Sequence, residues 1–196
     1  LVSENQIIAL DARIIIYEEK EPQAELAIRP YPAKWISSHK LDEKNTIQIR
    51  PILPEDEPSV VEFHKHLSEK SLRLRYVQSF HYDERTAHER MIRICFNDYE
   101  RDISLIALIG EETLGIARLS KVPGSKDAVF TMIVKDQWQN RGIGSELLQR
   151  ILEIAKEEKV GYIYAKVLDE NLQMKKILDR FGFTVEQTKE KLMTMK

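Results

Sequence analysis

The sequence predicts a mixed α/β (α+β) domain in which helices flank a central, mostly antiparallel sheet. Three observations lead to this fold class. Residues 102–134 hold short β-branched segments separated by turn residues, which is typical of antiparallel strands joined by hairpins. Stretches with apolar residues at helical spacing lie before and after these segments. The last β-branched segment leads through a glycine-containing turn directly into an amphipathic helix.

Composition limits the kinds of protein this can be. With 196 residues and 42% apolar content, the chain can bury one sizeable core and carry an appendage. The formal net charge of -2 gives no reason to expect a nucleic-acid partner. No apolar run approaches the roughly 20 residues that cross a bilayer, so we expect no membrane partner. The single cysteine, Cys95, fits a buried helix position and a reducing compartment, so we expect a cytoplasmic protein.

Residues 1–40 do not read like the beginning of a domain. Residues 7–17 are apolar and β-branched, like a strand that lacks a partner. Three prolines between positions 22 and 32 then mark an extended segment that cannot be helical. We therefore predict two parts: the tail of an upstream domain plus a linker (1–40), and one further domain (41–196).

The second part opens with a strand and two helices. Residues 46–51 alternate between polar and apolar side chains and end at a proline, as a short strand does. Proline and acidic residues at 54–57 then begin a helix. A second helix is predicted from near Asp83, because Met91 and Cys95 follow at helical spacing.

The remaining elements follow from the same patterns. Three strands cover residues 103–109, 114–121 and 128–134, with turn residues between them. The amphipathic helix that opens at Gly142 stops before Gly161. After it we predict a strand at 161–168, a helix at 171–181, a strand at 183–185 and, from Met193 and Met195, a last strand on one edge of the sheet.

Residues 139–144, between the strand at 128–134 and its helix, are predicted to bind an anion. The first N–H groups of a helix lack internal partners and carry partial positive charge, and glycine lets a phosphate approach the backbone. Two familiar phosphate loops are excluded. The dinucleotide-binding pattern needs a third glycine where Leu147 stands, and the P-loop needs a lysine where Ser145 stands.

Four histidines, at positions 64, 66, 81 and 88, invite a comparison with metal sites. No carboxylate or cysteine stands at a recognised ligand spacing from them, so we expect no metal. Surface positions or hydrogen-bonded core positions are the simpler interpretation.

The anion-binding loop resembles that of a known family. With Gln139, Gly142 and Gly144 followed by a helix, it is similar to the Gln/Arg-x-x-Gly-x-Gly/Ala loop of the GNAT superfamily, the acyl-CoA-dependent N-acyltransferases. The predicted order of elements over residues 46 to about 196 also resembles the GNAT fold. Residues 171–174 with the later Phe-Gly-Phe at 181–183 look like the family's asparagine-led helix. The resemblance implies an enzyme that uses acetyl-CoA as co-substrate and needs no metal.

Three longer segments, 50–56, 67–76 and 98–102, narrow the resemblance. They are similar to the bacterial Pat-type protein lysine acetyltransferases, in which a GNAT domain is fused to an NDP-forming, acyl-CoA-synthetase-like region with an ATP-grasp module. Residues 10–14 look like the last strand of that module. The resemblance thus implies a synthetase-like domain upstream in the same chain.

The resemblance also implies a set of cofactor-binding residues. Backbone groups of Ile133 and Val134 would hydrogen-bond the pantetheine arm, and Asn171 would position this arm or its thiol end. The loop would hold the pyrophosphate with Gln139, Asn140, Arg141, Gly142, Ile143, Gly144 and Ser145.

The catalytic side chains match the family less well. The Pat-type pattern places a glutamate base where Val129 stands, and the family's frequent tyrosine acid is replaced by Leu178. A base is needed because a lysine with a pKa of about 10.4 is almost entirely protonated at pH 7. Asp127 is the nearest carboxylate, two residues back on the same predicted face. It is a candidate base, and a turn-capping aspartate is the alternative.

Three functions remain open from the sequence. The first, which we expect, is transfer of an acetyl group from acetyl-CoA to an amine, with a protein lysine, such as one of an acyl-CoA synthetase, as acceptor. The second is a non-catalytic acyl-CoA-sensing module that regulates the synthetase-like region. The third is acetylation of a small amine or polyamine. The missing glutamate favours the sensor, whereas the complete cofactor loop fits all three.

Overall fold

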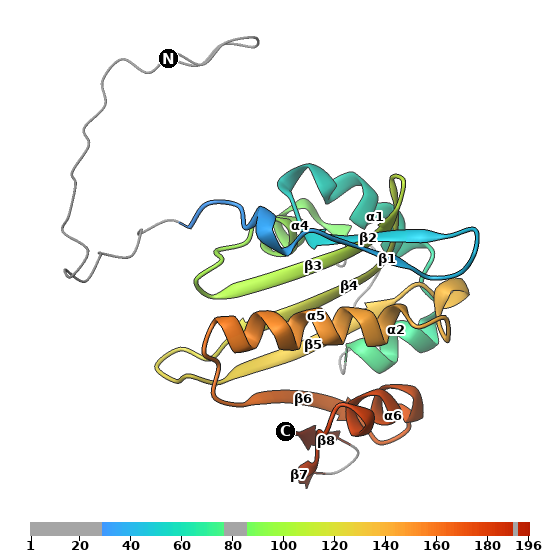
Figure 1. Ribbon diagram of the computed structural model, residues 1–196. Helices are drawn as coiled ribbons and strands as arrows, with labels where there is room; N and C mark the ends of the chain where they lie inside the picture. The colour runs from blue at the N-terminus through green and yellow to red at the C-terminus, as the bar shows by residue number, and fades with distance from the viewer. Residues whose placement is uncertain (1–28, 77–85, 190–191) are drawn as a thin grey trace, which may run out of the picture.

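An eight-stranded sheet forms the centre of the protein (Figure 1). The computed structural model describes residues 29–76, 86–189 and 192–196. The strand order is β1-β2-β3-β4-β5-β6-β8-β7, and the pairs are antiparallel except for β5 with β6. The strands are β1 Ser37–Lys40, β2 Thr46–Pro51, β3 Asp102–Ile109, β4 Glu112–Lys121, β5 Ala128–Val134, β6 Ile163–Leu168, β7 Val185–Lys189 and β8 Leu192–Met195.

Helices cover both faces of this sheet. Helices α1, α2 and α4 build a hydrophobic cluster on one face, and α5 and α6 pack on the other. The helices are α1 Glu57–Lys65, α2 Glu69–Arg75, α4 His88–Cys95, α5 Ile143–Glu157 and α6 Leu172–Arg180. Three short 3₁₀ helices are η1 Ala33–Trp35, η2 Pro54–Asp56 and η3 Asp136–Trp138. This is the mixed, mostly antiparallel architecture predicted from the sequence.

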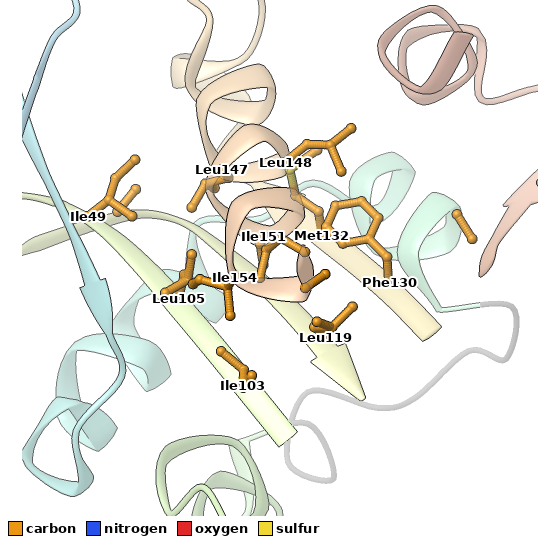
Figure 2. Packing of buried hydrophobic residues seen from close by; sticks show 14 of the residues in the cluster. Ile49, Ile103, Leu105, Leu119, Phe130, Met132, Leu147, Leu148, Ile151 and Ile154 are labelled. Atoms are coloured by element: carbon orange, nitrogen blue, oxygen red, sulfur yellow. The ribbon is translucent and has the colours of Figure 1, made fainter. Parts of the chain in front are cut away.

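The apolar side of α5 fixes this helix on the sheet. Leu147, Leu148, Ile151 and Ile154 recur at helical spacing and point toward sheet side chains such as Phe130 (Figure 2). None of these five side chains is more than 3% exposed, and burial of each contributes roughly 1.5–3 kcal/mol. The N-terminus of α5 is therefore held in one place relative to the end of β5.

Cys95 lies in the cluster on the opposite face, as predicted. It is 1% exposed and packs with residues such as Phe63 and Met91. Burial raises the pKa of its thiol to about 12, so the reactive thiolate is scarce.

No helix in the described part of the chain is long and apolar enough to cross a membrane.

Two elements escaped the prediction because their sequences lack a strong pattern. Strand β1 lies in the segment assigned to the linker, yet Ser37 pairs with Ile49 of β2. Its sequence Ser-Ser-His-Lys offers no apolar alternation, which is acceptable for a strand at the edge of the sheet. Helix α2 has only seven residues and begins at Ser68, whose hydroxyl accepts a hydrogen bond from the N–H of Ser71.

The position predicted for the last strand is wrong. Strand β8 pairs with β6 on one side and with β7 on the other, so β7 is the edge strand. The physical reason is the burial of the methionines: Met193 is 8% exposed and Met195 is 1% exposed. Side chains this buried need neighbours on both sides.

The strand predicted at residues 7–17 and the helix start near residue 83 lie outside the described residues.

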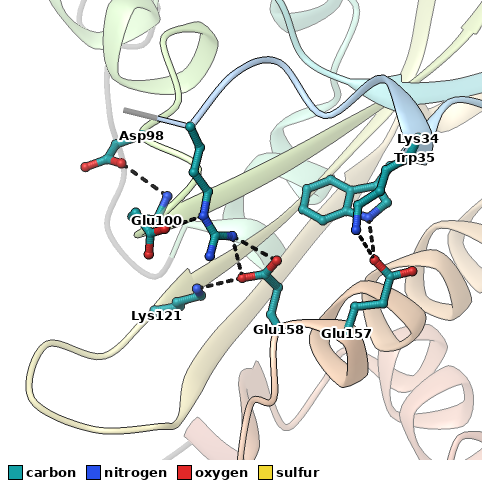
Figure 3. Close-up of polar contacts among 8 residues, drawn as sticks. Lys34, Trp35, Asp98, Glu100, Lys121, Glu157 and Glu158 are labelled. Atoms are coloured by element: carbon teal, nitrogen blue, oxygen red, sulfur yellow. Dashed lines mark hydrogen bonds and ion pairs between the residues drawn. The ribbon is translucent and has the colours of Figure 1, made fainter. Parts of the chain in front are cut away.

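Ion pairs tie the segment that precedes β1 to the C-terminal end of α5 (Figure 3). Glu158 accepts hydrogen bonds from Arg29, at 2.8 Å, and from Lys121, at 2.9 Å. Glu157 accepts from Lys34, at 2.7 Å, and from the indole of Trp35, at 3.0 Å. Carboxylates at the C-terminal end of a helix oppose its dipole, and these cations offset that repulsion.

Candidate functional site

Strands β5 and β6 separate partway along their length. Their parallel ladder pairs Ala128 with Ile163 and ends where Phe130 meets Ala165. Both strands continue beyond this point, β5 to Val134 and β6 to Leu168. The separation opens a cleft of about 650 Å³ that α2, α5 and α6 help to line.

The backbone of β5 exposes two sets of polar groups to this opening. The N–H of Lys135 donates to β4, and that of Ala128 donates to the chain next to β6. Because alternate residues point to opposite neighbours, Met132 and Val134 direct their backbone groups toward the opening. The ladder with β6 ends at Phe130, so Met132 and Val134 are not paired with β6.

Ile133 also lines the cleft, but its backbone groups face β4 rather than the opening. Its carbonyl oxygen would be 3.2 Å from a Cβ placed at Gly115 of β4, so its backbone groups face β4. Its side chain is buried in the cluster with α1 and α4. The alternation rule adds Met132, which also lines the cleft and was not predicted from the sequence. Counting back in twos from Val134 would have found it.

The loop after β5 brings the uncapped start of α5 to one end of the cleft. Gly142 precedes the helix with φ of 92°, a left-handed conformation that favours glycine, and no side chain caps it. The N–H of Glu146 donates to Gly142. The N–H groups of Ile143, Gly144 and Ser145 come before it, in the turn where a helix provides no internal acceptor.

A hydrogen-bond network holds the loop against α2. Both hydroxyls of Ser68 and Ser71 donate to the carboxylate of Asp136, at 2.5 Å and 2.8 Å. Gln139 donates to the hydroxyl of Ser71 and to the carbonyl of Val134, at 3.0 Å each. Partial burial of Asp136 tends to raise its pKa, but the hydrogen bonds from Ser68 and Ser71 outweigh this effect and hold the pKa below its usual value.

Other predicted loop residues lie at or near the cleft. Asn140 lines it, with φ of 60°, and its side-chain oxygen accepts from Gln173 of α6. The guanidinium of Arg141 lies 4.8 Å from the ring centre of Trp138 rather than in the cleft lining. Ile143 is 1% exposed, so its side chain belongs to the core and only its backbone can face a ligand.

Asn171 lines the cleft from the start of α6. Its side-chain oxygen caps that helix by accepting from the N–H of Met174 at 3.1 Å. The cap fixes the orientation of the side chain at the cleft wall. The asparagine-led helix that the sequence analysis singled out is therefore part of the site.

The cleft has two parts that differ in chemistry. The loop half consists of Val134, Gln139, Asn140, Gly142, Gly144 and Ser145. The α2 half consists of Lys70, Leu74, Arg75, Thr131 and Lys166. Five of the six charged side chains that line the cleft are basic, although acidic residues outnumber basic ones in the chain, 32 to 30. The cleft therefore favours an anionic ligand.

Asp127 does not line the cleft. It precedes β5 in the turn, and its carboxylate accepts a hydrogen bond from the N–H of Tyr162 at 3.1 Å. This position matches the turn-capping alternative, and a role as base stays a prediction. Val129 is half-buried on β5, and Leu178 is fully buried in the core. Neither can exchange a proton.

The described residues contain no group of three or more histidine, cysteine, aspartate or glutamate side chains arranged to hold a metal. His64 is buried between the rings of Phe63 and Tyr76. His66 and His88 contact Glu62 and Glu57 at the surface. His81 lies outside the described residues.

This geometry has a match among known proteins. Residues 69–183, more than half of the chain, match the profile described as the acetyltransferase (GNAT) family. The chain belongs to the GNAT family. GNAT proteins are acyl-CoA-dependent acetyltransferases that use acetyl-CoA.

Two similar proteins are of the Pat type. The chain is 27% identical over 134 residues to the acetyltransferase Pat of Mycolicibacterium smegmatis, which covers 68% of this chain and 40% of that protein. The GNAT domain of S. lividans PAT superposes with a TM-score of 0.77 at 26% identity, over 85% of this chain and 98% of that one. The chain thus spans well under half of the M. smegmatis protein.

A third similar structure was solved with coenzyme A bound. The PaiA N-acetyltransferase from Thermoplasma acidophilum, solved in complex with coenzyme A, has a TM-score of 0.64 at 19% identity, covering 76% of this chain and 96% of that one. At this identity the likeness extends to the fold alone.

Proposed function

We propose that this GNAT domain transfers an acetyl group from acetyl-CoA to the side-chain amine of a protein lysine. The observation that carries the proposal is the separation of β5 from β6 after Phe130 and Ala165. It opens a continuous cleft from the uncapped start of α5 to the face of β5 covered by α2. A phosphorylated donor would lie at the α5 end of this cleft, and an amine acceptor would lie at the end that α2 covers.

The donor would be held mainly by backbone groups. The N–H groups of Ile143, Gly144 and Ser145 suit a diphosphate, because helix dipole and unpaired donors favour anions there. An added Cβ at Gly144 would lie only 3.1 Å from Met132, so this glycine keeps the approach open. Asn140 lines the cleft beside these groups. Gln139 positions the loop rather than contacting the ligand.

The backbone groups of Met132 and Val134 would align the rest of the donor. Amide-rich pantetheine can pair with a strand edge as a neighbouring strand would. The N–H of Met132 would polarise the thioester carbonyl, and one such donor contributes about 3 kcal/mol to transition-state stabilisation. Asn171, oriented by its hydrogen bond to Met174, would border the thiol end.

The reaction forms one C–N bond and breaks one C–S bond. The acceptor amine loses a proton, and the leaving thiolate, with a pKa of about 8.5, can depart without a strong acid. Asp136 is the one carboxylate among the described cleft-lining residues, and its oxygens already accept from Ser68 and Ser71. We therefore propose that the amine loses its proton to water rather than to a side chain.

The wider context is proposed from the Pat-type resemblance. Pat-type enzymes join such a domain to an acyl-CoA-synthetase-like region, and we propose the same origin for residues 1–28. The anchoring of residues 29–35 at the far end of α5 supports an entry into the domain opposite the loop half. Acyl-CoA synthetases are candidate acceptor proteins on the same ground.

The test combines binding and turnover. Titration calorimetry with acetyl-CoA should give a single site, and thiol release in the presence of lysine peptides should follow acetyl-CoA consumption. Acetylated product identified by mass spectrometry on the lysine side chain supports the proposal. Binding without transfer to any amine would favour the sensor instead, and transfer to polyamines alone would favour a small-molecule acetyltransferase.

A further inference from the structure

The α2 half of the cleft gathers basic side chains from two separate elements. Lys70 and Arg75 belong to α2, and Lys166 belongs to β6. Ala165 and Val167, on either side of Lys166, are buried in the cluster with α5. Because neighbouring strand residues point to opposite faces, Lys166 is directed to the face that α2 covers.

Arg75 has no acidic partner among the described residues. Its guanidinium lies 4.8 Å from the ring centre of Tyr76, and its electrostatic neighbours are the cations Arg118 and Arg90. Burial, together with these cations, lowers its pKa, but a guanidinium remains charged at neutral pH. Arg118 differs, because Asp102 pairs with it at 2.9 Å. A partly buried cation without a counterion is costly unless a ligand supplies one.

The phosphates of the donor are a poor candidate for that counterion. Ser68, at the start of α2, is bound to Asp136 beside the phosphate loop. Arg75 is seven residues further along the helix, about 10 Å along its axis. It lies near Arg118, which pairs with Thr131 in the middle of β5. Arg75 is therefore close to where the strands separate and the acceptor amine must arrive.

We propose that Arg75, assisted by Lys166, binds a carboxylate of the acceptor, so that the preferred substrate is a lysine with aspartate or glutamate beside it in its own protein. The inference rests on the proposed lysine acetylation and adds its sequence preference. A guanidinium suits this task because its planar donors pair with a carboxylate through two parallel hydrogen bonds. Because Val129 adds no negative charge to this face, nothing there offsets the positive charge of Arg75 and Lys166. These two cations therefore repel polycationic acceptors.

Paired peptides provide the test. One peptide carries glutamate on both sides of a single lysine, the second carries glutamine there, and the third carries arginine. We expect kcat/KM to be at least about tenfold higher for the glutamate peptide than for the glutamine peptide, as a charge-assisted pair implies. Arg75→Gln should abolish this ratio and leave the Kd for acetyl-CoA unchanged. Arg75→Glu should reverse the ratio in favour of the arginine peptide.

A matched control lies on the same helix. Arg73 pairs with Glu170 at 3.1 Å and does not line the cleft, so Arg73→Gln should keep the wild-type ratio. Lys166→Gln, at an exposed position, should reduce the ratio by a smaller factor and tests the idea even if Arg75 variants fold poorly. Equal kcat/KM for the glutamate and glutamine peptides in the wild type overturns the inference.

An equal loss of rate with all three peptides in the Arg75→Gln variant also overturns the inference. Such a loss would mean that Arg75 stabilises the departing thiolate instead. Calorimetric titration of the peptides into the coenzyme A-saturated protein distinguishes a failure of the proposed lysine acetylation from a failure of the charge preference. Absent turnover with tighter binding of the glutamate peptide would contradict the proposed function and support the charge preference. Turnover that is faster with spermidine than with the glutamate peptide would contradict the preference alone.

Discussion

The two halves of the cleft use different parts of the chain. The loop half presents main-chain N–H groups, fixed by a glycine at φ of 92° and by a helix that is anchored in the core. The α2 half presents side chains, namely Lys70, Arg75 and Lys166. A main-chain site needs only glycines and a helix start, so it survives wide sequence change. A side-chain site changes chemistry with each substitution.

Under the proposed function, this difference would allow the domain to keep a donor site while the residue at its catalytic position changes. Val129 stands where the Pat-type resemblance predicts a glutamate, and it is not among the residues that line the cleft. Donor binding and acceptor chemistry should therefore respond separately to mutation and to pH.

The largest expected effect is on the pH dependence of turnover. If water takes the proton, kcat/KM for a lysine peptide should rise about tenfold per pH unit from pH 7 to 9, because the neutral fraction of a lysine rises in that proportion. Acetyl-CoA affinity measured over the same range should stay flat. A plateau near pH 7 would reveal a side-chain base and break the contrast between the halves.

Gly142→Val should weaken the loop half alone. A β-branched residue at φ of 92° is strained by roughly 1–2 kcal/mol. If the loop relieves this strain by turning its N–H groups away from the ligand, binding must restore it, so calorimetry should give about fivefold to thirtyfold weaker acetyl-CoA binding. Gly110→Val is the matched control, because Gly110 has φ of 57° in the turn between β3 and β4. The Gly110→Val variant should lose similar stability but keep its affinity for acetyl-CoA. Equal acetyl-CoA affinities for the two variants would contradict the main-chain site.

Asp136→Asn tests the connection between the halves. Loss of the charge that Ser68 and Ser71 bind should lower the free energy of unfolding by about 0.5–1 kcal/mol, since solvent screens this exposed residue. Acetyl-CoA affinity should fall a few-fold as the loop loosens. Because the folded pKa of Asp136 is lowered, its contribution is complete above the unfolded value of about 3.9 and fades below it. Urea unfolding should show the wild-type advantage shrinking below about pH 4.

Asp127→Ala should have the smallest effect on function. It removes the acceptor for the N–H of Tyr162 and should cost about 1 kcal/mol of stability. Turnover, assayed by thiol release, should change less than twofold with the same pH profile. A hundredfold loss of rate with retained acetyl-CoA binding would instead restore Asp127 as the base.

Much of this molecule was predictable because it follows local rules. Strands β2 and β5 have the predicted bounds, and the loop with Gly142 and Gly144 opens α5 as expected. Apolar alternation, helical spacing and glycine conformation are all properties of a few neighbouring residues. For the same reason the β1 strand, with its polar sequence at a sheet edge, was invisible.

What the sequence by itself determined is the order of most elements and the glycine-containing turn that opens α5. The phosphate-binding role of this turn and the glutamate expected at Val129 stay predictions. Only the tertiary structure decided that the backbone groups of Met132 rather than Ile133 face the opening, that β8 lies inside the sheet, and that Arg75 and Lys166 line the same cleft. These outcomes depend on which strand lies beside which. Arg75 and Lys166, for example, are nearly a hundred positions apart and line the same cleft. No local sequence pattern encodes that proximity.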